Sequence, residues 1–205
     1  MIVPSMSKEE IIKEILFDFD MVKRKSEYVI KDQISELSKT KKYPFVKAYD
    51  YVTPKTKNKW IYIIELKTKN DIFQTFVNYH DTSIGIRAGL VMTNKEIVFF
   101  TGHFFKRFVE RGKLDIASPI DKMKEFFTLN PMLSYEDRDE LVGGGYEIIG
   151  RVKSGVVLGI RNKKNILVCN TYLSNEMLRN DQTLIANSLK AEIDYYISTQ
   201  NPGLM

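Results

Sequence analysis

The stretch Lys59-Trp-Ile-Tyr-Ile-Ile-Glu-Leu-Lys67 is the strongest secondary-structure signal in the chain. It is rich in β-branched and aromatic residues and follows the turn-forming segment Pro54-Lys-Thr-Lys-Asn58, so it predicts a β-strand that begins at a hairpin. Similar runs, separated by short turns, lie on either side of it: 45–52, 72–79, 84–92 and 97–101. Five consecutive strands with short connections predict an antiparallel meander.

Helices are expected on both sides of this region. Ser7-Lys-Glu-Glu10 has the pattern of a capping box and begins a long helix, which the pattern allows either to continue through Ser26 or to break there. A helix at about 103–110 should end at Gly112, in the left-handed position that favours glycine, and another should begin at Ser118 and Pro119.

The rest of the chain completes an α+β pattern. Residues 136–145, an acidic run followed by three glycines, are expected to form a flexible connection. Three strands should follow at 146–153, 155–161 and 166–172, and then a closing helix capped by Ser174. We therefore expect one α+β domain over 1–205, in which the N-terminal helix packs on the meander and the closing helix covers a three-stranded antiparallel C-terminal sheet. A subdivision into 1–96 and 97–205 is possible.

Composition narrows the function classes. The chain has 205 residues, of which 43% are hydrophobic and 28% charged, and no apolar run is long enough to cross a bilayer, so we expect a soluble folded protein without a membrane partner. No secretion signal precedes the first helix, and we expect a cytoplasmic location. One cysteine, Cys169, and two histidines, His80 and His103, exclude a disulfide framework and make a Cys- or His-based metal site improbable. No cofactor is expected.

The net charge of +5 is unevenly distributed. Nine lysines stand against two acids between Lys39 and Lys69, and five bases against none between Arg151 and Asn170. Clustered cations favour a polyanion, because they displace the counterions condensed on its phosphates. We expect RNA or another nucleic acid as the partner, bound by Lys106, Lys113, Arg151, Lys153, Arg161 and Lys163, unless the lysines only protect exposed sheet edges.

The segment His103-Phe-Phe-Lys-Arg-Phe-Val-Glu-Arg111 carries the most chemical information. On a helix, His103, Arg107 and Arg111 share one face and the three phenylalanines share another. An imidazole can transfer protons near neutral pH, and guanidinium groups stabilise charge on phosphate oxygens, so this face suits phosphodiester chemistry. The alternative is an ordinary amphipathic helix whose arginines pair with Glu110 or with the acidic run at 136–140.

This helix is followed by a Gly-containing hairpin, Gly155-Val-Val-Leu-Gly-Ile160, and by a strand that ends in Asn170-Thr-Tyr172. The order resembles the barnase, EndoU, colicin and RelE-like ribonuclease superfamily. It is most similar to small bacterial and phage domains with a His-x-x-x-Arg-x-x-Glu-Arg helix, some of them toxin-like. The resemblance covers about residues 97–180. It implies metal-free RNA cleavage through the 2′-hydroxyl, with His103 as acid or base, Arg107 and Arg111 on the phosphate, and Thr171 or Tyr172 orienting a phosphate oxygen.

Two other functions stay open. Asp50, Glu65 and Lys67 resemble the Asp…Glu-x-Lys pattern of restriction-type nucleases, which implies a Mg²⁺-dependent enzyme that a chelator would inhibit. The protein could also be a non-catalytic module that binds nucleic acid or another protein. The sequence indicates no oligomeric state.

Overall fold

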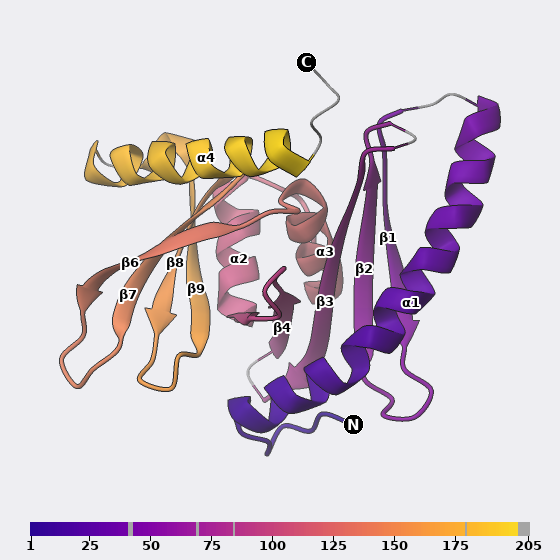
Figure 1. Ribbon diagram of the computed structural model, residues 1–205. Coiled ribbons are helices and arrows are strands. Elements are labelled where there is room, and N and C mark those ends of the chain that lie inside the picture. Colours follow the sequence, from indigo (N-terminus) through magenta and orange to yellow (C-terminus); the bar gives the residue numbers. More distant parts are fainter. Residues whose placement is uncertain (41–42, 69, 84, 179, 201–205) are drawn as a thin grey trace. The chain divides into compact units, whose positions relative to one another are not determined.

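The computed structural model describes residues 1–40, 43–68, 70–83, 85–178 and 180–200 (Figure 1). The chain divides into two compact units, Met1–Val98 and Phe99–Met205. Three lysines of the first basic segment, Lys41, Lys42 and Lys69, lie outside the described residues, as does the expected first residue of the fourth strand, Ile84.

The first unit begins with helix α1, Lys8–Thr40. Its capping box is present: the amide of Ser7 donates to Glu10 Oε2 at 2.7 Å, and the amide of Glu10 donates to Ser7 Oγ at 3.3 Å. The helix continues through the buried Ser26, whose hydroxyl bonds to the Lys23 carbonyl and to Gln74 Oε1, each at 2.7 Å. The Ser26 hydroxyl is therefore hydrogen-bonded without a break in the helix, which resolves the alternative left open by the sequence.

Strands β1 (Phe45–Val52), β2 (Lys59–Leu66), β3 (Ile72–Thr82), β4 (Gly85–Val91) and β5 (Ile97–Phe100) follow in the chain. The register places Tyr49, Tyr62 and Phe76 opposite one another, and residues opposite in an antiparallel ladder share a face. Phe19 of α1 packs edge-on against Phe76 with ring centroids 5.3 Å apart, so α1 covers this face of the strands (Figure 1).

The second unit contains α2 (Gly102–Arg111), α3 (Pro119–Leu129), strands β6 (Ser134–Glu140), β7 (Tyr146–Val152), β8 (Gly155–Arg161) and β9 (Leu167–Ser174), the short 3₁₀ helix η1 (Asn175–Met177) and α4 (Asn180–Gln200). Tyr172 of β9 packs among Phe104, Phe108 and Phe126 from α2 and α3. Ala186 of α4 packs instead with Ile149 and the neighbouring apolar residues of β8. The two helix groups therefore lie on opposite faces of β6–β9.

The expected arrangement of a five-stranded meander and a separate three-stranded C-terminal sheet is wrong. All nine strands belong to one mixed sheet, in the order β1-β2-β3-β4-β5-β9-β8-β7-β6. The additional strand, β6, contains the charged run from Glu136 to Glu140, which the sequence analysis assigned to a flexible connection. Its backbone pairs with β7 while its charged side chains stay exposed, so this strand forms without an apolar face.

Smaller differences concern the ends of elements. Ser174 makes no side-chain capping bond, and η1 intervenes before α4 begins. After α2, Gly112 is right-handed (φ −81°) and Lys113 takes the left-handed position (φ 54°). A Cβ atom at Gly112 would lie 2.9 Å from the Phe108 carbonyl oxygen, so glycine is needed there for close approach rather than for handedness. No helix of the described residues is long and apolar enough to span a membrane.

Candidate functional site

The outer face of α2 carries the histidine and arginines singled out by the sequence. Thr101 caps the helix, accepting a hydrogen bond from the Phe104 amide at 3.2 Å. The residues buried on its inner side are Phe104, Phe105, Phe108 and Val109. Burial of this side fixes the rotation of the helix and directs His103, Lys106 and Arg107 away from the core.

His103 and Arg107 are in direct contact on this face. The Arg107 Nε donates to His103 Nε2 at 3.3 Å, so Nε2 is the acceptor in this hydrogen bond. Glu110 completes the cluster: its Oε2 lies 3.3 Å from Arg107 Nη1, and its Oε1 lies 3.8 Å from Lys106 Nζ. We call His103, Lys106, Arg107 and Glu110 the α2 cluster. Its cations and carboxylate are solvent-exposed, so these ion pairs are exchangeable for other partners.

Arg111 has a different position. It is half-buried, and its Nη1 donates to the backbone carbonyl of Tyr172. This bond fastens the last turn of α2 to β9. Because this bond uses one N–H of the Arg111 guanidinium, only the remaining N–H groups could donate to a ligand.

Tyr172 is a core residue in this structure. Only 2% of its surface is exposed, and its hydroxyl donates to the Ser154 carbonyl at 2.7 Å and lies 3.0 Å from Ser154 Oγ. Burial raises the pKa of this phenol, an effect that the hydrogen bond to Ser154 opposes. Tyr172 thus holds the β7–β8 turn and does not reach the α2 cluster.

Thr171 lies on the other face of the sheet. Its register partner is Leu158, whose partner in turn is Ile149, and all three share a face. Ile149 and Leu158 pack with Ala186 of α4. The structure therefore separates Thr171 from His103 by the thickness of the sheet.

The remaining predicted cations are dispersed. Arg151 pairs in register with Val156 on the α4 face and donates to Asn175 Oδ1 at 2.5 Å. Arg161 lies over the ring of Tyr135 at 5.5 Å and 3.2 Å from Asp137 Oδ1, an ion pair with the acidic run. Lys113, Lys153 and Lys163 are exposed. Among the predicted binding residues, these three lysines and the cations of the α2 cluster are exposed enough to contact a large anionic ligand.

The alternative metal site is not assembled. Asp50 pairs with Ile61, and Glu65 lies on the same face four residues further along β2, about 13 Å away at the usual strand rise. One Mg²⁺ ion with ligands at about 2 Å cannot take both carboxylates. Lys67 is exposed just beyond the end of β2. In the described parts of the chain, no group of three or more histidine, cysteine or acidic residues could hold a metal ion.

His80 is the polar residue that the sequence analysis undervalued. The expected third strand ends at residue 79, before His80 and Asp81, but both residues belong to β3, which continues to Thr82. Asn78 and Asp81, residue types that favour turns, stand at this end of the strand and weaken the strand pattern. His80 is buried and lines a cavity of the first unit.

No protein-family model, curated protein or solved structure matches this chain.

Proposed function

We propose that this protein cleaves RNA without a metal ion, using the α2 cluster. The observation that carries the proposal is the contact between the exposed His103 imidazole and the Arg107 guanidinium. The contact places a proton acceptor beside a permanent cation on a face that a polymer can approach. The substrate we expect is cytoplasmic RNA, as in the ribonuclease superfamily that the motif of α2 resembles.

The chemistry follows from these two side chains. The ribose 2′-oxygen attacks the phosphorus, the bond from phosphorus to the 5′-oxygen breaks, and the products are a 2′,3′-cyclic phosphate and a 5′-hydroxyl. When substrate binds, Arg107 Nε leaves His103 Nε2, which then accepts the 2′-hydroxyl proton, and water supplies the proton that the leaving 5′-oxygen takes up. Arg107 exchanges its bond to Glu110 for one to the phosphate and stabilises the charge that develops there.

The other predicted site residues take lesser parts. Arg111 is a positioning residue that fixes the end of α2 through the Tyr172 carbonyl. Thr171 and Tyr172 are left out of the proposed site, because the first faces α4 and the second is committed to Ser154.

The test is incubation of the full chain with mixed RNA in EDTA, followed by analysis of the product ends. We expect 2′,3′-cyclic phosphate ends, and a rate lower by about 10² to 10⁴ in His103→Ala, the usual contribution of acid–base catalysis. Lys190→Ala removes an exposed cation of α4 outside the cluster and outside the predicted binding residues, and this control variant should retain cleavage.

Two outcomes contradict the proposal. Cleavage that needs Mg²⁺ and is lost in Glu65→Gln would indicate the metal-dependent alternative. RNA binding that weakens with salt, without turnover in EDTA or in Mg²⁺, would indicate a binding module.

A further inference from the structure

The outer face of α1 carries two large aromatic side chains that lie outside the core. Phe17 is 63% exposed and Tyr28 is 66% exposed. The fully buried positions of α1 lie on the opposite side of the helix: Ile11, Ile15, Asp18, Val22, Ser26 and Ile30. Because their burial fixes the rotation of the helix, Phe17 and Tyr28 point away from the core.

Phe17 and Tyr28 belong to one stripe along the helix. They are 11 residues apart, which is three turns plus about 20°, and about 16 Å along the helix axis. Three exposed cations, Lys13, Arg24 and Lys31, lie within about 40° of the direction of Phe17. We call these five residues the α1 stripe.

Each ring of the α1 stripe has a lysine ammonium group beside it. Lys55 Nζ, from the turn between β1 and β2, lies 5.6 Å from the ring centroid of Phe17. Lys31 Nζ lies 5.9 Å from the ring centroid of Tyr28. An ammonium group at this distance is attracted to the π-face of the ring, so each exposed ring forms a pair with a cation.

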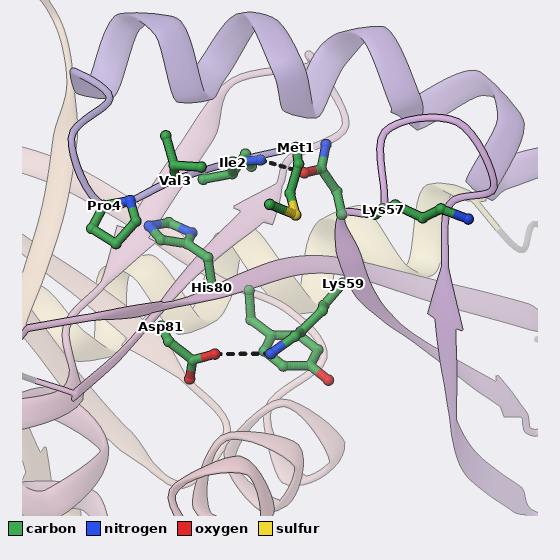
Figure 2. A pocket seen from close by; sticks show the side chains of 10 residues that line it. Met1, Ile2, Val3, Pro4, Lys57, Lys59, His80 and Asp81 are labelled. Carbon is green, nitrogen blue, oxygen red and sulfur yellow. Dashed lines mark hydrogen bonds and ion pairs between the residues drawn. The ribbon is translucent and has the colours of Figure 1, made fainter.

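The turn that carries Lys55 is fastened to α1 by a buried polar network. Thr56 Oγ1 donates to the two oxygens of Asp18 at 2.9 and 2.7 Å, and Asn58 Nδ2 donates to Asp18 Oδ2 at 2.7 Å. Asn58 Oδ1 in turn accepts a hydrogen bond from the Ile2 amide at 2.7 Å, which is drawn in Figure 2. Because Asp18 and Thr56 directly follow the first ring and Lys55 in the sequence, the network keeps this ring and this cation together.

The spacing of the two rings is typical of a surface for single-stranded nucleic acid rather than of a protein interface. The centre of a protein interface is apolar and poor in charged residues. The exposed residues of α1 between the two rings are instead all charged: Asp20, Lys23, Arg24, Lys25 and Glu27. Surfaces that bind single strands combine separate rings, on which bases stack, with cations that contact the phosphates.

The charge beside the rings favours a polyanion. Four exposed cations, the three of the α1 stripe and Lys55, lie next to the two rings. Of the acids, Asp20 and Glu27 lie at the margin of the stripe, about 60–80° away, and Glu10 accepts a hydrogen bond from the Ser7 amide at 2.7 Å. A nucleotide offers a base to a ring and a phosphate to the ammonium group beside that ring, so it matches each pair.

We propose that the α1 stripe binds single-stranded nucleic acid, with one base stacked on Phe17, another on Tyr28, and phosphates at the lysines beside them. A single strand is expected rather than a duplex, because only unpaired bases can separate from their neighbours and stack on a side chain. The stripe belongs to the first unit and shares no residue with the α2 cluster. It therefore binds a strand whether or not that cluster cleaves RNA.

The test measures binding of the full chain to a fluorescently labelled oligoadenylate of about 12 nucleotides by fluorescence anisotropy. Its riboses carry 2′-O-methyl groups, which leave no 2′-hydroxyl to attack, so binding is measured separately from cleavage. We expect saturable binding that weakens with salt, with a logarithmic slope of about −3 if each of the four cations contacts one phosphate. A 2′-O-methyl duplex of the same length should bind about tenfold more weakly, because its bases cannot stack on the rings.

Substitutions on the stripe test the stacking directly. Phe17→Ala and Tyr28→Ala should each weaken binding about tenfold, the usual loss for one stacked base. Phe17→Tyr keeps an aromatic ring and should retain the affinity, whereas Phe17→Leu keeps an apolar side chain without a ring and should weaken binding as Phe17→Ala does. Tyr195→Ala, the same change at a 71% exposed tyrosine of α4, is the matched control and should bind as the wild type does. All three positions are exposed, so the variants should remain folded.

Several results would overturn the proposal. The first is a lack of binding by the unchanged protein at low salt, and the second is a duplex that binds more tightly than the single strand. An affinity that Phe17→Leu retains, or that Tyr195→Ala loses equally, would show that the rings of the stripe are not used. Competition by polyglutamate that is as effective as competition by unlabelled oligonucleotide would indicate an acidic protein as the partner instead.

Discussion

The chain's two histidines occupy opposite surroundings. His103 is exposed at the start of α2 and accepts a hydrogen bond from Arg107, whereas His80 is buried in β3 with no partner among the described residues. Exposure suits His103 to a polymer that must approach from solvent, whereas burial keeps both ring nitrogens of His80 away from solvent. The same side chain thus has two different chemistries, which its burial and its neighbours determine.

Arg107 gives the largest effect that this comparison predicts. If it stabilises charge on the phosphate, Arg107→Gln should lower the RNA cleavage rate about 10²- to 10³-fold, the usual loss for one such donor. Single-turnover cleavage in EDTA measures the effect, with Lys106→Gln on the same face as the control. If the cleavage rate fell equally in both variants, the outer face of α2 would contribute only its positive charge, and Arg107 would have no specific role.

Asp18 tests a buried polar network of the first unit, in which its carboxylate accepts hydrogen bonds from Asn58 and Thr56. Asp18→Ala leaves Asn58 and Thr56 without their buried acceptor, and the free energy of unfolding should fall by about 3 kcal/mol. Urea denaturation measures this change. In protein that remains folded, cleavage by the α2 cluster should be unchanged. Loss of cleavage would mean that the two regions are coupled.

The pKa of His80 predicts a dependence of stability on pH. Its value of about 4 in the folded chain lies below the ordinary 6.5, so the unfolded chain binds more protons between these values. Stability is therefore retained above pH 6.5 and lost as the pH falls towards 4, by about 2 kcal/mol between pH 7 and pH 5. Urea denaturation of wild type and His80→Gln at several pH values isolates this contribution. A pH dependence of the unfolding free energy that is as large in His80→Gln as in the wild type would contradict the assignment.

Tyr172 gives the smallest effect and separates a structural role from a catalytic one. Tyr172→Phe removes one hydrogen bond to Ser154 and should lower the free energy of unfolding by about 1 kcal/mol. The cleavage rate per folded molecule should stay unchanged. A large loss of rate at unchanged stability would return Tyr172 to the candidate site.

Helices and strands that have a clear side-chain pattern are easier to predict from the sequence than a strand that is held in the sheet by backbone pairing alone. β2 follows from its apolar run, and the start of α1 follows from its capping box. The edge strand β6 has no such pattern, because its hydrogen bonds come from the backbone and its exposed side chains tolerate any charge.

The candidate site was predictable only within one helix. The shared face of His103 and Arg107 is set by helical spacing, which the sequence contains. Whether Thr171 or Tyr172 faces α2 depends on which helix covers which face of the sheet, and that information is not local. The burial of His80 likewise depends on residues 1–4, more than seventy positions away in the chain.

The charged run of β6 has a consequence for how copies of the chain meet. β6 is the last strand in the sheet order, and an edge strand offers unpaired backbone groups to any second chain. Four of the five residues from Glu136 to Glu140 are acidic, and the ladder is interrupted by an irregularity between Asp137 and Glu140. A second copy that added its own β6 would bring like charges together along a broken ladder, so this edge resists self-association and the aggregation that starts from it.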